Sequence, residues 1–505
     1  MLFKDFTQDI NPHQAYRIKK LKRQLETAET YEEWKSIALE IDEETGAQEW
    51  KYDNCSPYFD AEIISERLNR LKRYRFQKRT EDLMYILREG LSYDIANIAN
   101  PMLFTATYVG TKKIIEDYVE EVSASLAYIA SDACSCSCLC LTEKIKFFQH
   151  CKKAYGQPAI MFSGGATLGL FHTGVCKALL EQDLMPKVIS GSSAGAIMTA
   201  MLGTSKPSDI SGLLNGENFF SEAFHFRKFS EILKGNGGFA DVMYLKKFLV
   251  ENLGDVTFEE AFKSSGLHIN VAVAPYDASQ EARIMNAYTS PDLLVWSAVL
   301  ASCAVPILFP PVKLTSKRQN GQLTPYMADT RWVDGSVRSD FPQEKMARLY
   351  NLNYTIASQV NPHIVPFMQS DAERHRRDLL SWPERIIRRQ GKVITKGIMD
   401  FTRDRVGKIP PVRRLLDHGF GVIDQGYYGD LNIVGDYSLR HYSYMFQNPR
   451  PYLFKLLQRE GERATWPKIS SIETHARVGK TIQHCLEILS YQDDPAQKEA
   501  EFIAV

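Results

Sequence analysis

The chain has 505 residues, of which 44% are hydrophobic and 24% charged, the proportions of a globular protein with a large core. Its formal net charge is zero, so the molecule as a whole has no electrostatic bias towards nucleic acid or anionic membranes. Charged and polar residues interrupt the first stretch too early for a secretory signal, which favours a cytoplasmic protein without structural disulfides.

Residues 1–130 are predicted to form a helical N-terminal extension. Within residues 111–130, apolar side chains recur at helical spacing, as at Ile115, Val119, Val122 and Leu126. Such a stripe is typical of a helix that packs in a core or against a partner helix.

Residues 131–157 are predicted to be a linker with a cluster of alternate cysteines at Cys134, Cys136, Cys138 and Cys140. This spacing differs from the paired spacing of zinc sites. Free thiols are the simplest interpretation. A soft-metal site on one face of a strand and S-acylation near a membrane are the alternatives.

Residues 158–360 alternate strand-like and helix-like segments. Strands are predicted at 159–162, 188–190, 268–274, 332–333 and 354–359, and helices at 170–182, 194–202, 243–252 and 293–301. This alternation predicts an α/β fold with a mostly parallel central sheet and helices on both faces. Residues 361–505 are predicted to complete or flank this domain as an irregular, helix-rich region.

The longest apolar stretch without a charge, residues 293–312, has 20 residues, which is the length of a membrane span. Pro306, Pro310 and Pro311 would break a helix in its second half. The stretch is therefore predicted to be a short buried helix, at about residues 292–304, followed by a proline-rich turn.

Residues 191–195 read Gly-Ser-Ser-Ala-Gly, with Ser193 at the centre, between an apolar strand and a helix of small and apolar residues. This context is typical of a nucleophile elbow, in which the serine sits on a sharp strand-to-helix turn. Gly191 and Gly195 remove the Cβ atoms that would clash there, and the helix N-terminus favours developing negative charge. An ordinary Gly/Ser turn is the alternative.

A second glycine-rich turn, Ser-Gly-Gly-Ala-Thr-Leu-Gly at residues 163–169, also follows a strand and opens a helix. Closely spaced glycines expose backbone N–H groups to a bound anion, which in acyl transfer is the tetrahedral oxyanion. A dinucleotide site does not fit, because Gly164, Gly165 and Gly169 are not two and three apart and no acidic residue ends the next strand. A phosphate-binding P-loop fails as well, because no Gly-Lys-Ser/Thr follows.

Gly164 precedes Ser193 by 29 residues, which is enough for one helix and one strand. The two turns are therefore predicted at the carboxyl ends of adjacent parallel strands, the edge where ligands bind in such sheets. Asp334 ends another apolar strand before Gly335, which predicts the same edge. An ionised carboxylate there could take the proton of Ser193 directly. A turn aspartate bonded to its own backbone is the alternative.

A Ser-His-acid triad would be another way to activate the serine. Eight histidines follow Ser193, so composition leaves this arrangement open. His172 precedes the serine, in the helix that the glycine-rich turn opens, and is predicted to pack or hydrogen-bond locally.

Residues 162–175, residues 191–195 and the pair Asp334-Gly335 together resemble the patatin-like phospholipases, and most closely the fungal and plant triacylglycerol lipases among them. Asn-Pro-His at 361–363 and Gly-Glu-Arg-Ala-Thr-Trp-Pro at 461–467 are similar to stretches of that subgroup. The region from Tyr31 to Ile114 is similar to the extension that precedes the patatin domain there. The resemblance covers about residues 30–470.

The resemblance implies a Ser-Asp dyad in which Ser193 is the nucleophile and Asp334 the base. It implies an oxyanion hole built from the glycine-rich turn and the elbow, at Gly164, Gly165, Ala166, Gly169 and Ala194. Gly191, Gly195 and Gly335 would support the motifs, and neither a metal nor an organic cofactor is implied.

Two positions depart from the pattern of the plant storage proteins in this family. Ala166 stands in place of a third glycine, and Ser336 follows Asp334-Gly335. Some fungal members also carry a His-x4-Asp acyltransferase motif, and none of the 11 histidines here has Asp five positions on. This lowers the expectation of a second, acyltransferase activity.

The expected function is hydrolysis of acyl esters, above all triacylglycerol, by a cytoplasmic enzyme that is peripheral on a membrane or lipid droplet. A phospholipase, lysophospholipase or acyltransferase on the same fold, or a non-catalytic lipid-binding scaffold, are the alternatives. The expected partners are a lipid ester substrate and a lipid droplet or membrane surface, not nucleic acid, and no oligomeric state is indicated.

A basic stretch bears on membrane contact. Residues 371–414 hold 13 Lys/Arg against 6 Asp/Glu, interleaved with apolar residues. Such a stretch could lie on a lipid surface or form a solvated helical face.

Overall fold

The computed structural model describes residues 11–131, 139–206, 208–216, 242–277, 280–306, 309–337, 341–361, 365, 428–437, 439–444 and 447–492. The chain divides into two compact units. The helical unit comprises Met1–Pro158, Ala347–Tyr354 and Thr465–Val505, and the sheet unit comprises Ala159–Met346 and Thr355–Ala464.

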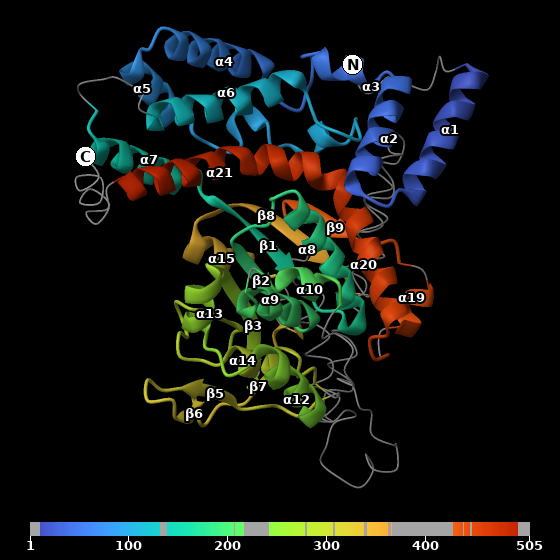
Figure 1. Ribbon diagram of the computed structural model, residues 1–505, viewed down its shortest axis with the longest axis vertical. Helices are drawn as coiled ribbons and strands as arrows, with labels where there is room; N and C mark the ends of the chain where they lie inside the picture. The colour runs from blue at the N-terminus through green and yellow to red at the C-terminus, as the bar shows by residue number, and fades with distance from the viewer. Residues whose placement is uncertain are drawn as a thin grey trace, which may run out of the picture. The chain divides into compact units, whose positions relative to one another are not determined.

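The helical unit is built from both ends of the chain. Its helices are α1 (Pro12–Thr27), α2 (Tyr31–Glu44), α3 (Ala47–Tyr52), α4 (Ala61–Phe76), α5 (Thr80–Gly90), α6 (Lys113–Ala130), α7 (Leu141–Tyr155) and α21 (Ile469–Gln492), with 3-10 turns at Ile95–Asn97, Pro101–Phe104 and Trp466–Lys468. Side chains of Asn11, Thr30 and Asp60 cap the first turns of α1, α2 and α4. Figure 1 shows α21 beside α6 and α7, which it contacts.

Helix α6 carries the apolar stripe predicted for residues 111–130. Ile115, Val119, Val122 and Leu126 are all buried in the core that α6 shares with α4, α7 and α21. The helix begins at Lys113, two residues after the predicted start. The predicted core role of this stripe is confirmed.

The sheet unit is organised around a seven-stranded sheet of order β4-β3-β2-β1-β8-β9, with β7 also paired to β3. The strands are β1 (Gln157–Phe162), β2 (Val188–Gly191), β3 (His268–Pro275), β4 (Arg283–Met285), β7 (Trp332–Asp334), β8 (Leu352–Gln359) and β9 (Leu431–Val434). The pairs β1–β2, β2–β3 and β8–β9 are parallel, whereas β4 and β7 run antiparallel to β3. A separate hairpin joins β5 (Leu314–Lys317) and β6 (Leu323–Tyr326).

The other described helices lie between or after these strands in sequence. They are α8 (Phe171–Glu181), α9 (Ala194–Thr204), α10 (Ile210–Leu214), α12 (Val242–Leu253), α13 (Phe258–Ser265), α14 (Val295–Ser302), α15 (Gln343–Tyr350), α19 (Leu439–Tyr444) and α20 (Pro451–Thr465), with 3-10 turns η3 (Ala166–Leu170) and η4 (Gly335–Val337). Helix α9 contacts β2 and β3, and α14 contacts β3 and β7. The predicted α/β class, a mostly parallel central sheet covered by helices, is confirmed.

The apolar stretch at residues 293–312 contains the buried helix that its prolines predict. All eight residues of α14, Val295–Ser302, are buried. The helix starts later than predicted, because Leu293 and Leu294 form isolated bridges to Ser316 and Thr257 instead. In the part of the chain that the structure describes, no helix combines the length and the apolarity needed to cross a bilayer.

Two regions singled out in the sequence lie outside the described residues. These are Cys134, Cys136 and Cys138 of the cysteine cluster, and the basic stretch at 371–414. Cys140 is described and is exposed.

Candidate active site

Ser193 occupies the turn from β2 to α9 and has an unusual backbone conformation. Its φ is 50° and its ψ is −118°, values that residues with a Cβ rarely adopt. The turn is tight on both sides of the serine. A Cβ on Gly191 would clash with the carbonyl oxygen of Gly195, and one on Gly195 would clash with that of Phe162. The motif therefore has the strained strand-to-helix geometry expected of a nucleophile elbow.

The glycine-rich turn lies beside this elbow. Strands β1 and β2 pair in parallel with Phe162 opposite Gly191, so the turns that follow them are neighbours. A Cβ placed on Gly164 would be 3.3 Å from Cβ of Ser193, and one on Gly165 would be 2.6 Å from Cγ2 of Val360. The main chain of Gly164 thus borders the serine, as the spacing of 29 residues predicts.

The other predicted oxyanion residues lie where this turn meets α9. Ala194 is the first residue of α9, where backbone N–H groups have no acceptor within the helix. Ala166 begins η3 with a φ of 51°. A Cβ on Gly169 would be only 2.5 Å from Cβ of Ala194, which favours a packing role for Gly169.

Asp334 ends β7 and is completely buried. Its Oδ1 accepts a hydrogen bond from the N–H of Ser336 at 2.8 Å. Among the described residues, Oδ2 has no hydrogen-bond partner in direct range. Burial raises the pKa of Asp334 to about 6, while interactions with Ser336 and with the Ser193 hydroxyl oppose that rise. The serine hydroxyl is therefore close to a buried carboxylate with one oxygen available.

Asp334 reaches this position at the end of an antiparallel strand. Strand β7 runs antiparallel to β3, with Asp334 opposite Val273, a direction that the sequence did not indicate. Gly335 turns the chain directly after the carboxylate, where a Cβ would clash with the carbonyl oxygen of Ala272.

His172 is fully buried and hydrogen-bonds to the main chain at the start of the glycine-rich turn. Its Nε2 lies 3.0 Å from the carbonyl oxygen of Ser163 and its Nδ1 lies 2.7 Å from Oγ of Ser358. The carbonyl can only accept, so Nε2 carries the proton and Nδ1 accepts from the Ser358 hydroxyl. Burial lowers the pKa of His172 to about 4, so the ring is neutral at physiological pH. The prediction of a local structural role agrees with these contacts.

Two histidines that follow Ser193 are described within the sheet unit, and each has contacts of its own. The ring of His268 stacks on Phe262, with centroids 4.4 Å apart, and Nε2 of His441 lies 3.0 Å from Oε1 of Glu460. Neither contact involves the serine.

Three site neighbours were not singled out in the sequence, namely Ser302, Cys303 and Ala304 at the end of α14. The N–H of Ser193 donates to Oγ of Ser302 at 2.9 Å, and the N–H of Asp334 donates to the carbonyl oxygen of Ala304 at 3.0 Å. Helix α14 is apolar except for two buried serines, Ser297 and Ser302, and a buried hydroxyl needs a hydrogen-bond partner, which was the available signal.

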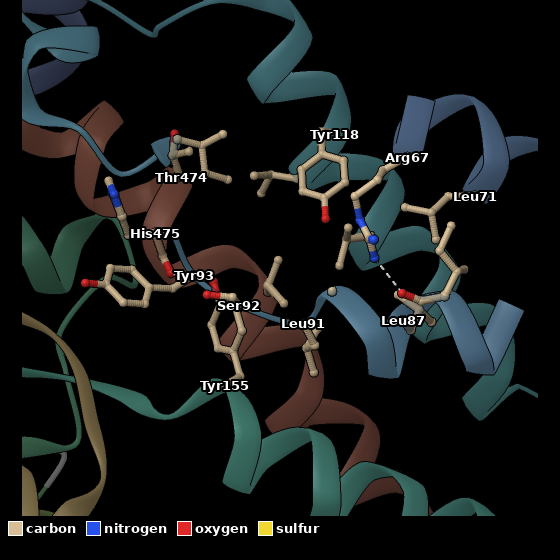
Figure 2. Close-up of a pocket in the computed structure, with 16 residues that line it drawn as sticks. Arg67, Leu71, Leu87, Leu91, Ser92, Tyr93, Tyr118, Tyr155, Thr474 and His475 are labelled. Atoms are coloured by element: carbon tan, nitrogen blue, oxygen red, sulfur yellow. Dashed lines mark hydrogen bonds between the residues drawn. The ribbon is translucent and has the colours of Figure 1, made fainter. Parts of the chain in front are cut away.

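The helical unit contains a small pocket that is partly open to solvent. Figure 2 shows Arg67, Tyr118 and Tyr155 among its lining residues, with the Arg67 guanidinium donating to the carbonyl oxygen of Ile86 at 2.6 Å. None of the predicted site residues lines this pocket. The predicted site residues all belong to the sheet unit.

Comparisons with known proteins agree with this geometry. A family model described as patatin-like phospholipase matches residues 160–346, and one described as a domain of unknown function (DUF3336) matches residues 12–153. Triacylglycerol lipase ptl3 of Schizosaccharomyces pombe is 31% identical over 91% of this chain and 95% of its own length. Triacylglycerol lipase ptl2 of the same yeast is 31% identical over 93% of this chain and 75% of its own length.

A plant relative is longer than this chain. Triacylglycerol lipase SDP1L of Arabidopsis thaliana is 29% identical over 97% of this chain, which spans 62% of that relative's length. The family match, the two yeast relatives and the strained serine turn agree with one another. The chain belongs to the patatin-like phospholipase family, as its motifs predict.

Proposed function

We propose that the protein is a serine lipid acyl hydrolase whose main substrate is triacylglycerol. The observation that carries the proposal is the convergence of a strained, buried Ser193, the main chain of Gly164 and the carboxylate of Asp334. The relatives named triacylglycerol lipases support acylglycerol as the substrate class.

In the proposed reaction, Oγ of Ser193 attacks the ester carbonyl carbon while its proton passes to Oδ2 of Asp334. Collapse of the tetrahedral intermediate expels the alcohol, which takes that proton, and leaves an acyl group on the serine. Asp334 then removes a proton from water, and the resulting hydroxide attacks the acyl-enzyme. The fatty acid leaves as Ser193 recovers its proton.

The negative charge of each intermediate needs donors on the ester oxygen. Backbone N–H groups of the glycine-rich turn, at Gly164 and Gly165, and of Ala194 at the start of α9 are the proposed donors. Each such donor contributes about a hundred- to a thousandfold in rate. His172 supports this turn indirectly by bonding the carbonyl of Ser163.

A fluorophosphonate probe together with two variants tests the dyad. Wild-type protein should be labelled at Ser193, and Ser193→Ala should abolish both labelling and turnover. Asp334→Asn should remove turnover as completely as Ser193→Ala does, because no other base lies on the proposed path. Labelling that survives Ser193→Ala would show that this serine is not the nucleophile. A histidine variant as inactive as Asp334→Asn would instead support a triad.

A substrate panel tests the lipid class. Emulsified tri- and diacylglycerol should be hydrolysed faster than phosphatidylcholine or lysophosphatidylcholine. Faster phospholipid hydrolysis would identify a phospholipase on the same fold. Absence of turnover on every ester would support a non-catalytic lipid-binding scaffold.

We also propose that the protein acts at a lipid surface, where the excess positive charge of residues 371–414 would favour binding to anionic lipid. Flotation with liposomes or lipid droplets should weaken when Arg385, Arg388 and Arg389 are neutralised. Unchanged flotation would exclude a role for these three arginines.

A further inference from the structure

The end of helix α14 holds the main chain on both sides of the site. Three consecutive residues make these contacts. Oγ of Ser302 accepts from the N–H of Ser193 at 2.9 Å, and Sγ of Cys303 donates to the carbonyl oxygen of Ser193 at 3.4 Å. The carbonyl oxygen of Ala304 accepts from the N–H of Asp334 at 3.0 Å. One turn of chain therefore bonds both the serine and the aspartate.

The Ser302 hydroxyl makes two hydrogen bonds and is completely buried. Besides accepting from Ser193, it donates to the carbonyl oxygen of Ala272 at 2.7 Å. That same carbonyl is the atom against which Gly335 packs, directly after Asp334. Ser302 thereby joins the serine turn to β3 at the residue before Val273, which pairs with Asp334.

These bonds act where the backbone is strained. Ser193 keeps its φ of 50° only if surrounding contacts oppose relaxation of the turn. The N–H of Ser193 donates to Oγ of Ser302 and is therefore not available as a donor to an oxyanion. Both its N–H and its carbonyl are held by the end of α14.

We infer that Ser302 is a positioning residue, whose hydroxyl holds the strained main chain of Ser193 at the separation from Asp334 that proton transfer needs. The inference rests on the proposed function. Ser302 touches neither substrate nor the reacting atoms, so its effect is on geometry, and a misplacement of about 1 Å can lower a rate about a hundredfold.

The same helix offers a matched control in Ser297. It is also fully buried, and its hydroxyl accepts a backbone N–H, that of Thr315, at 2.8 Å. Ser302→Ala and Ser297→Ala each remove one buried hydroxyl from α14. Only the first removes a bond to the serine turn.

The experiment compares kcat and KM of the two variants on one emulsified ester. Ser302→Ala should lower kcat about 10- to 100-fold with KM nearly unchanged. Ser297→Ala should keep kcat within about twofold of wild type. Ser302→Cys, which retains a weak donor and acceptor, should recover part of the loss.

Hydrogen exchange gives a second readout that does not depend on turnover. The amide of Ser193 should exchange faster in Ser302→Ala than in wild type and stay protected in Ser297→Ala. Equal kcat in the two alanine variants, or an unchanged Ser193 amide in Ser302→Ala, would overturn the inference.

A folding failure of the variant and a failure of the proposed function would give different results. Should Ser302→Ala fail to fold, Ser302→Gly, which also removes the hydroxyl from the last residue of α14, takes its place, and a wild-type kcat in that variant overturns the inference. Wild-type protein that neither turns over esters nor labels at Ser193 would refute the proposed function itself, and the positioning role with it.

Discussion

Two buried side chains near Ser193 have pKa values shifted in opposite directions by the same cause. Burial raises the pKa of Asp334 to about 6 and lowers the pKa of His172 to about 4. In each case burial disfavours the charged form. The carboxylate thus becomes a stronger base than an exposed aspartate, while the imidazole stays neutral and keeps both of its hydrogen bonds.

The raised pKa of Asp334 predicts how activity depends on pH. The base must be ionised, so kcat/KM should rise with pH through a limb near pH 6. Ser336→Ala removes a side-chain interaction that lowers this pKa, and should move the limb to higher pH. A pH profile of kcat/KM for both proteins measures this. A limb near pH 4, or none, would mean that Asp334 is not the titrating base.

The two shifts also predict opposite effects on stability. Between about pH 4 and 6, folded Asp334 keeps a proton that the unfolded chain has lost, so stability falls as pH rises. At 1.36 kcal/mol per pKa unit the loss is about 3 kcal/mol. For His172 the unfolded chain takes up the proton first as pH falls, so stability rises with pH between about 4 and 6.5 by a similar amount.

Because these two contributions offset each other in wild type, a variant that lacks one of the two groups should reveal the contribution of that group. Urea unfolding of Asp334→Asn should show the free energy of unfolding increasing from pH 4.5 to 6.5 more steeply than in wild type, by about 2 kcal/mol over the interval. Identical pH slopes in the two proteins would show that burial does not shift the Asp334 pKa as described.

At the scale of elements, the glycine-rich turn depends on the packing of helix α8 against α20. Gly174 of α8 faces α20, where a Cβ would clash with the carbonyl oxygen of Gln458. Gly461 of α20 faces α8, where a Cβ would clash with the carbonyl oxygen of Phe171. The two backbones approach closely because neither position carries a side chain. Since α8 continues directly from η3, this contact also supports the turn beside Ser193.

Gly174→Ala and Gly461→Ala should therefore each destabilise the protein by about 1–3 kcal/mol and reduce turnover, because an added methyl forces α8 and α20 apart. Gly479→Ala in α21 is the matched control. Its Cβ would make ordinary contact with the Tyr155 ring at 3.5 Å, so it should stabilise by up to about 1 kcal/mol. Urea unfolding and ester turnover measure both effects. Equal effects of the three substitutions would exclude close helix packing as the cause.

The elements themselves were largely foreseeable. The strands that became β1, β2, β3 and β8 are apolar runs, and each was predicted within two residues of its bounds. β4, β5, β6 and β9 have three or four residues each and were not predicted. The four residues of β2 are all buried, whereas these missed strands are only partly buried and show no continuous apolar run, so pairing partners decide whether they form.

At the scale of the whole molecule, the last helix completes a unit that the first helices begin. Helix α21 packs against α6 and α7, and Val478, Ile482, Cys485 and Leu489 belong to the same buried core as Ile115. The sequence of the N-terminal extension alone therefore does not contain its whole core.

Two isoleucines of α21 test this arrangement. Ile482 is 1% exposed and Ile488 is 41% exposed. Ile482→Ala should destabilise the helical unit by about 2–5 kcal/mol, because it leaves a cavity in the shared core. Ile488→Ala should change stability by less than about 1 kcal/mol. Urea unfolding of both variants decides the matter, and equal losses would show that α21 does not complete this core.

The features that the sequence alone could predict are those determined by contiguous residues. The serine turn needs an apolar strand, two glycines and a following helix, all within residues 188–204. The parallel placement of Gly164 beside Ser193 follows from one helix and one strand between them, because successive units of this kind pair side by side.

Other features were decided by packing between distant parts of the chain. The antiparallel course of β7, the bonds from the end of α14 to both Ser193 and Asp334, and the return of α21 to α6 all join residues far apart in sequence. Local pattern shows that a side chain is apolar or needs a hydrogen-bond partner. Which partner it meets depends on how the folded elements fill space, and that information exists only when the whole chain has packed.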